Sequence, residues 1–169
     1  KLKGRNNSHH FVLYAFQNPL LLPPLNDVRD LRNPDGSLVT STLFYMQNHI
    51  FLAGGTDVNT DYTFPPGVAM RFPAAFPVDL NAHYFNKSNL LITGENYINF
   101  YTVPQATIVN EAKTLNLNNT DIAIAPGERK TLVKTFSFNT ITRVLMLTSH
   151  NHRLGEKFII KIAGGPRNG

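Results

Sequence analysis

The chain has 169 residues, of which 42% are apolar and 16% are charged, with a net charge of +5 and no cysteine. This length and apolar content suit one or two domains with a hydrophobic core, and they exclude a disordered chain or a coiled coil. The absence of cysteine excludes disulfides, thiolate metal sites and cysteine nucleophiles.

Short apolar and β-branched runs alternate along the chain with clusters of proline, glycine and asparagine. This alternation predicts strands, and no segment keeps a helical period over three turns. Sharp turns are expected at 33–36 (NPDG), 65–67 (PPG), 126–128 (PGE) and 164–166 (GGP). The predicted strands are 10–16, 43–53, 67–72, 76–85, 96–103, 107–115, 120–125, 129–138, 141–152 and 157–163. The pattern predicts an all-β fold of antiparallel, jelly-roll-like β-sandwiches.

A polar break at 86–89 (NKSN) follows the strand that ends in Tyr84 and Phe85. It predicts a division into two domains, residues 1–88 and residues 89–169, each of them part of a sandwich. The chain starts with Lys1 rather than methionine, and we expect further domains of a longer chain as partners.

The positive charge raises the question of nucleic-acid binding. The basic residues lie near both ends and around one turn, and they form neither a basic helix nor a motif with stacking aromatic residues. No apolar run approaches the roughly 18 residues that a membrane helix requires. We therefore expect no nucleic-acid partner and no membrane span.

The histidines are the main chemical signal in the sequence. His9 and His10 open a predicted strand, His83 is near the end of another, and His150 and His152 end a third. Residues two apart on a strand point to the same face, about 7 Å apart, so His150 and His152 are suited to chelate one copper or zinc ion. Adjacent His9 and His10 point to opposite faces of a regular strand, so they share a metal only if the strand twists or bulges there.

The alternative for each single histidine is a surface or hydrogen-bonded side chain without a metal. His49 lies within an apolar strand, and we interpret it as structural. On the strand before His83, Asp79 and Asn81 share its polar face, which faces either solvent or a site. No nucleophile elbow, phosphate-binding loop or His-Glu-x-x-His motif is present.

The order of these clusters resembles the copper type II, ascorbate-dependent monooxygenases, the family of peptidylglycine α-hydroxylating monooxygenase and dopamine β-monooxygenase. The matching segments span nearly the whole chain. They are 8–14 (SHHFVLY), 65–69 (PPGVA), 80–84 (LNAHY), 101–105 (YTVPQ), 124–128 (IAPGE) and 148–157 (TSHNHRLGEK).

The resemblance implies two jelly-roll-like domains with one copper each, separated by a water-filled cleft, in a secreted, periplasmic or cell-surface protein. His9, His10 and His83 match the ligands of the copper that transfers electrons. His150 and His152 match two ligands of the catalytic copper, which binds oxygen. The implied activity is hydroxylation of a C–H bond of an unknown small molecule or peptide, with O₂ and ascorbate or another one-electron reductant.

Two departures from the family pattern bear on this expectation. Thr148 stands where the peptide-hydroxylating enzyme has a substrate-binding arginine, so a peptidylglycine substrate is not implied. The third ligand of the oxygen site is a later methionine in the family, whereas Met46, Met70 and Met146 all precede His150. The alternative hypothesis is a non-catalytic copper-binding or structural β-sandwich module of a secreted or surface assembly.

Overall fold

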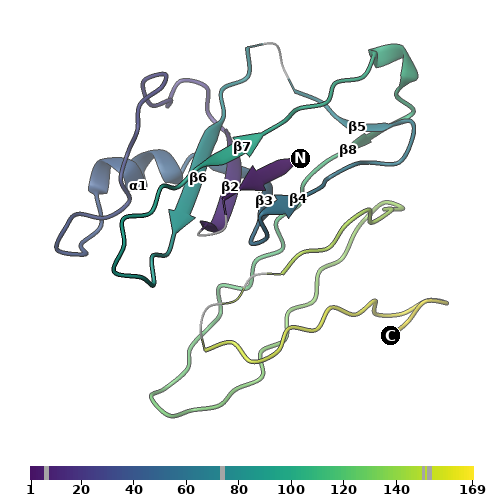
Figure 1. Cartoon of the computed structure of the whole chain (residues 1–169). Coiled ribbons are helices and arrows are strands. Elements are labelled where there is room, and N and C mark those ends of the chain that lie inside the picture. Colours follow the sequence, from purple (N-terminus) through teal and green to yellow (C-terminus); the bar gives the residue numbers. More distant parts are fainter. Residues whose placement is uncertain (6–7, 73–74, 150, 152–153) are drawn as a thin grey trace. The chain divides into compact units, whose positions relative to one another are not determined.

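The computed structural model describes residues 1–5, 8–72, 75–149, 151 and 154–169, and it divides the chain into two compact units. Unit 1 comprises residues 1–120 and unit 2 comprises residues 121–169. Figure 1 shows that all labelled helices and strands belong to unit 1. The predicted domains 1–88 and 89–169 stay a prediction; two of the strand pairings in unit 1 join residues from both sides of residue 88.

The described part of unit 1 is β-rich and contains three small sheets. Two are antiparallel and three-stranded, with the orders β4-β1-β7 and β3-β2-β6, and the third is the parallel pair β5-β8. The strands are β1 (Leu2–Gly4), β2 (Ser8–Phe16), β3 (His49–Gly55), β4 (Asn59–Thr60), β5 (Val68–Met70), β6 (Asp79–Tyr84), β7 (Asn96–Ile98) and β8 (Asn110–Ala112). The helices are α1 (Thr40–Met46) and the short 3₁₀ helix η1 (Gln105–Thr107).

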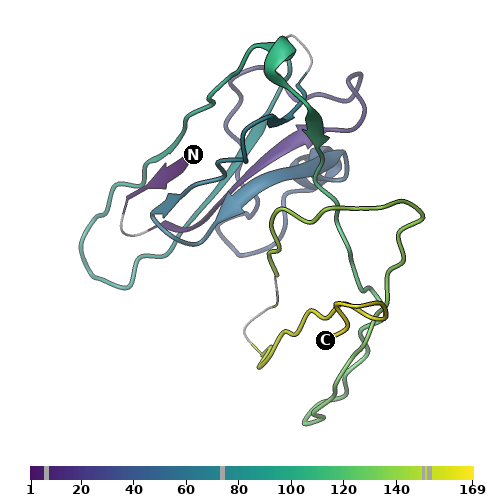
Figure 2. The ribbon, with the colours of Figure 1, turned by 90° about the vertical axis from the view of Figure 1, so that its right-hand side faces the viewer.

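Strand β2 is the centre of its sheet and of the core. It pairs with β3 on one side and with β6 on the other, as both views of the ribbon show (Figures 1 and 2). Phe11, Leu13 and Ala15 alternate along it and are 5%, 3% and 2% exposed. Leu13 lies opposite Leu80 of β6, so these two apolar side chains lie on the same face of the sheet.

The turns predicted from glycine and proline are present. In residues 65–68 and again in residues 125–128, the amide of the last residue donates to the carbonyl oxygen of the first, at 3.1 and 3.0 Å. Gly67 and Gly127 have φ angles of 77° and 76°, the left-handed conformation that the third position of a type II turn requires. Gly36, with φ 85°, closes the predicted turn at 33–36.

The predicted strand 43–53 is wrong in its first half, because α1 occupies residues 40–46. Hydrogen bonds to residues distant in the sequence stabilise this helix and the turn that follows it. The buried Thr42 hydroxyl donates to the carbonyl oxygen of Asp30 at 2.8 Å. Two residues after the helix, the buried Asn48 amide nitrogen donates to the carbonyl oxygens of Asn18 and Leu21, at 2.9 and 2.8 Å. These contacts, which no local pattern announces, override the strand propensity of the apolar run.

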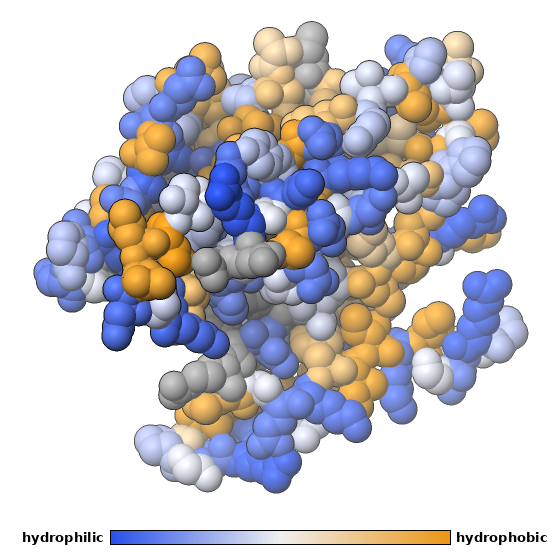
Figure 3. Space-filling model, viewed as in Figure 1, coloured by the Kyte–Doolittle hydropathy of each residue, from blue (hydrophilic) through white to orange (hydrophobic). Residues whose placement is uncertain are grey.

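Unit 2 differs from the expectation. Among its described residues no strand is assigned, so the strands predicted at 120–125, 129–138 and 157–163 and the described part of 141–152 are not formed. Its apolar side chains are largely exposed: Val133 is 82% and Leu154 86% exposed. A strand is stable when it has a hydrogen-bonding neighbour and a buried face, and none of the described residues in these segments is buried. Figure 3 shows apolar side chains, in orange, on the surface of the molecule.

Within the described ranges, no helix is both long and apolar enough to span a bilayer.

Candidate metal centre

The antiparallel pairing of β2 with β6 brings the first three predicted ligands together. His10 lies directly opposite His83, and Val12 and Tyr14 lie opposite Asn81 and Asp79 on the same face of the sheet. His83 therefore projects beside His10 because β6 keeps its period-two alternation up to its end.

His9 joins the pair through an irregularity in β2. The register with β6 shifts between Ser8 and His10, because Ser8 lies opposite Tyr84 and His10 opposite the preceding residue, His83. Two residues of β2 thus oppose one step of β6, which is a β-bulge with His9 as the extra residue. The sequence predicts that His9 and His10 can share a metal only if the strand twists or bulges, and this bulge is present.

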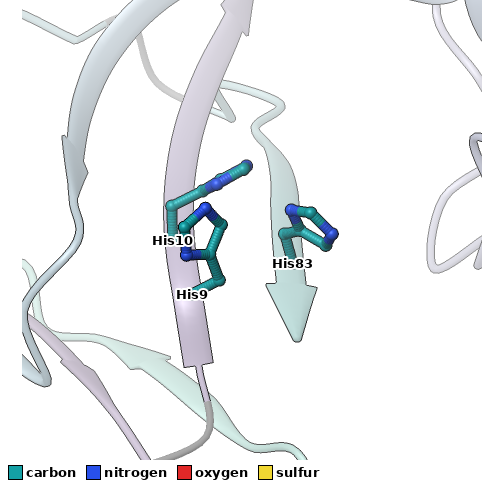
Figure 4. Close-up of side chains that lie close together, drawn as sticks. All are labelled: His9, His10 and His83. Atoms are coloured by element: carbon teal, nitrogen blue, oxygen red, sulfur yellow. The ribbon is translucent and has the colours of Figure 1, made fainter. Parts of the chain in front are cut away.

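The three imidazole rings converge on one point (Figure 4). Their centroids are 4.9 Å apart for His10 and His83, and 5.3 Å from His9 to each of the others. One nitrogen from each ring lies within 4.8 Å of the other two. Three nitrogens about 2.0 Å from one ion are about 3.3–3.5 Å apart, so modest side-chain rotation would complete a coordination site.

The position of the cluster allows solvent to reach it. His9 and His83 are exposed and His10 is half-buried. The triad contributes only imidazole nitrogens, a donor set that suits copper or zinc and does not suit magnesium or calcium. The residues present therefore fit a copper ion by their chemistry.

The other two predicted ligands, His150 and His152, lie outside the described residues. Their role in a second copper site stays a prediction from the sequence. Met146, on the same predicted strand, is 46% exposed.

A second polar cluster, which sequence reasoning missed, lies at the opposite end of the same sheet. The Asp79 carboxylate accepts from Arg29 at 2.5 Å and lies 2.9 Å from Nε2 of His49. The His49 side chain is 6% exposed, and its ring stacks on Tyr14 with centroids 4.4 Å apart. His49 is thus packed as a structural histidine. Arg29 comes from a long loop, so no strand pattern could place it beside Asp79.

The electrostatics of this cluster follow from its pairing. The hydrogen bond from His49, supported by the charge of Arg29, holds the pKa of the Asp79 carboxyl below its ordinary 3.8. Burial, together with the charge of Asp79, raises the pKa of the Tyr14 phenol above 10.0. The ionised carboxylate is therefore the form that the fold stabilises.

Replacing Asp79 with asparagine should lower the free energy of unfolding by about 2 kcal/mol at neutral pH, because charge-assisted bonds to Arg29 and His49 are lost. The folded pKa lies below the unfolded one, so the carboxylate stabilises the fold above about pH 4, and this contribution disappears as the pH falls through the folded pKa. Urea unfolding at a series of pH values should show a flatter acid limb for Asp79→Asn. The exposed Asp57→Asn serves as the control; an equally flat limb in that variant would contradict the assignment.

A hollow of about 270 Å³ lies away from the histidines, among residues of the loop and helix between β2 and β3. Its lining includes Arg29, Arg32 and Thr42. The three-histidine cluster is an open surface site, and it is not part of this hollow.

Comparison of the chain with protein-family models, with curated proteins and with solved structures finds no match.

Proposed function

We propose that this chain binds a copper ion through His9, His10 and His83, and that the ion serves electron transfer in a copper-dependent monooxygenase. The observation that carries the proposal is the convergence of three imidazoles from two paired strands, through a bulge that gives both adjacent histidines access to one point. Three neutral imidazoles suit both oxidation states of copper, so a copper ion bound there would supply one-electron transfer.

The protein's own residues define what this site can do. The β2–β6 pairing holds His10 and His83 at fixed separation, and the exposure of His9 and His83 lets a reductant approach from solvent. Sites held on strands are more rigid than sites on loops, and a rigid ligand set changes little when the ion changes charge.

The resemblance to the copper type II, ascorbate-dependent monooxygenases supplies the rest of the proposal. By that resemblance, His150 and His152 hold the catalytic copper of a second site, and the protein is secreted, periplasmic or on the cell surface. The two sites would lie in jelly-roll-like sandwich domains, and the reaction would be hydroxylation of a C–H bond with O₂ and ascorbate or another one-electron reductant.

Copper titration of the full chain, with bound metal measured by mass spectrometry, tests the proposal. We expect one tight equivalent at His9, His10 and His83 and a weaker second equivalent at His150 and His152. His150→Ala should lose the second equivalent and all copper-dependent oxygen consumption with ascorbate, while the first equivalent is retained. Asn151→Ala is the matched control, because residue 151 lies between the two histidines in the sequence and carries no imidazole.

The outcomes separate the two hypotheses. Copper at the first site without oxygen consumption above that of the same amount of free copper would favour the non-catalytic copper-binding module. Failure to bind copper at all would contradict both the monooxygenase and the copper-binding module, and it would leave the structural module as the remaining hypothesis.

A further inference from the structure

The side chain of Asn96 joins the two strands that carry the histidines. Its carbonyl oxygen accepts from the Ser8 hydroxyl at 3.2 Å, and its amide nitrogen donates to the Tyr84 hydroxyl oxygen at 2.6 Å. Ser8 directly precedes His9 on β2, and Tyr84 directly follows His83 on β6. One amide from β7, a strand of the sheet β4-β1-β7, therefore bridges the neighbours of two candidate ligands.

This bridge lies where the β2–β6 ladder is weakest. The bulge interrupts the pairing between Ser8 and His10, β2 begins at Ser8, and β6 ends at Tyr84. Strand ends open more readily than strand centres, and a bulge leaves one residue outside the ladder. The Asn96 side chain is hydrogen-bonded to the ends of both strands. It therefore restrains the distance between these ends, which the interrupted ladder does not fix.

Two glycines leave the space that the bridge requires. Gly4 lies opposite Asn96 on β1, and a Cβ at residue 4 would come within 2.5 Å of the Asn96 carbonyl oxygen. A Cβ at Gly94 would come within 2.4 Å of the Tyr84 ring. Neither glycine has a positive φ angle, so the absence of a side chain at these two positions serves packing and is not required by the backbone.

We propose that Asn96 is a positioning residue of the three-histidine site. It holds the ends of β2 and β6 at the spacing that directs His9 and His83 toward one ion, and it acts through Ser8 and Tyr84. This inference rests on the proposed metal binding by His9, His10 and His83.

Replacement of Asn96 in the full chain, with copper(II) as the probe, tests the role. Leucine keeps the branched shape and the number of heavy atoms of asparagine, with bulkier methyl groups, and it removes both hydrogen bonds. Asn96→Leu should therefore weaken copper binding roughly tenfold, the lower end of what outer partners of metal ligands contribute. The electron paramagnetic resonance spectrum of bound copper(II) should broaden or change its hyperfine splitting, because the ligand geometry is less uniform. Asn96→Asp should restore affinity and spectrum, since a carboxylate accepts from both hydroxyls.

The matched control is Asn59→Leu. Asn59 is an exposed asparagine on β4, in the same sheet as Asn96, and it lies opposite Lys3. We expect this variant to keep the copper affinity and the spectrum of the unaltered protein. Gly4→Ala should reproduce the effect of Asn96→Leu, because the added methyl group displaces the Asn96 side chain.

The outcomes distinguish the inference from the function on which it rests. Unaltered copper affinity and spectrum in Asn96→Leu, with copper bound by the unaltered protein, would overturn the positioning role alone. An equal loss in Asn59→Leu, or a failure of Asn96→Asp to restore binding, would also overturn it. If the unaltered protein bound no copper, the proposed function would be overturned and the positioning role with it.

Discussion

Replacing His83 with alanine should remove one equivalent of copper from the protein and leave the sheet folded. A four-ligand zinc site gains about 10–16 kcal/mol, so one ligand contributes about 3 kcal/mol, which is roughly a 100-fold change in affinity. His83 is exposed at the end of β6, and it contributes nothing to the buried core. The affinity for copper(II) should therefore fall on the order of 100-fold, while the thermal midpoint of the metal-free protein changes little.

Competition titration with a chelator of known affinity measures this effect, and circular dichroism reports the fold. The matched control is His49→Phe, which removes a histidine of the same sheet but keeps a ring to stack on Tyr14. It should lose stability, because the bond to Asp79 is lost, and it should bind copper as before. A His83→Ala protein that binds copper as tightly as the unaltered chain would exclude the triad as the site.

Replacing Leu13 with alanine should cost about 3 kcal/mol of the free energy of unfolding. Leu13 is 3% exposed on the central strand of its sheet, and truncation of a buried leucine removes apolar contacts and leaves a cavity. Its cross-strand partner Leu80 is 50% exposed, so Leu80→Ala removes the same atoms from a site that is already half in water. This second variant should cost about 1 kcal/mol.

Urea denaturation of both variants, followed by circular dichroism, gives the comparison. Both variants make the same leucine-to-alanine change on one face of one strand pair. The difference between their losses of unfolding free energy therefore measures the effect of burial. Equal losses in the two variants would mean that β2 is not the centre of the core.

Much of the sheet around the site could be predicted from the sequence, because it depends on local periodicity. The alternation from Asp79 to Tyr84 gives β6 its two faces, and the apolar residues from Phe11 to Phe16 mark the most buried strand. The convergence of His9 with His10 was predicted only as a condition, since a bulge depends on the partner strand as well as on its own residues.

What the sequence does not reveal are contacts between distant segments. Asn96 follows Ser8 by 88 residues, and Arg29 precedes Asp79 by 50, so neither side chain belongs to a local motif. The apolar run from Leu43 to Met46 has strand propensity and nevertheless forms a helix. In unit 2 the apolar patterns are as regular as those in unit 1, yet its described segments have no strand partner. Strand formation depends on that partner as much as on the pattern.

The exposure of His9 and His83 also affects how fast an ion would bind and dissociate. An ion at this cluster meets water directly, so its exchange with a small chelator needs no opening of the sheet. The amide hydrogens at the centre of β2, by contrast, exchange only when that sheet opens. The residence time of a bound metal and the hydrogen-exchange protection of the backbone beneath it would therefore be independent quantities, and removal of the ion would leave a slowly exchanging core.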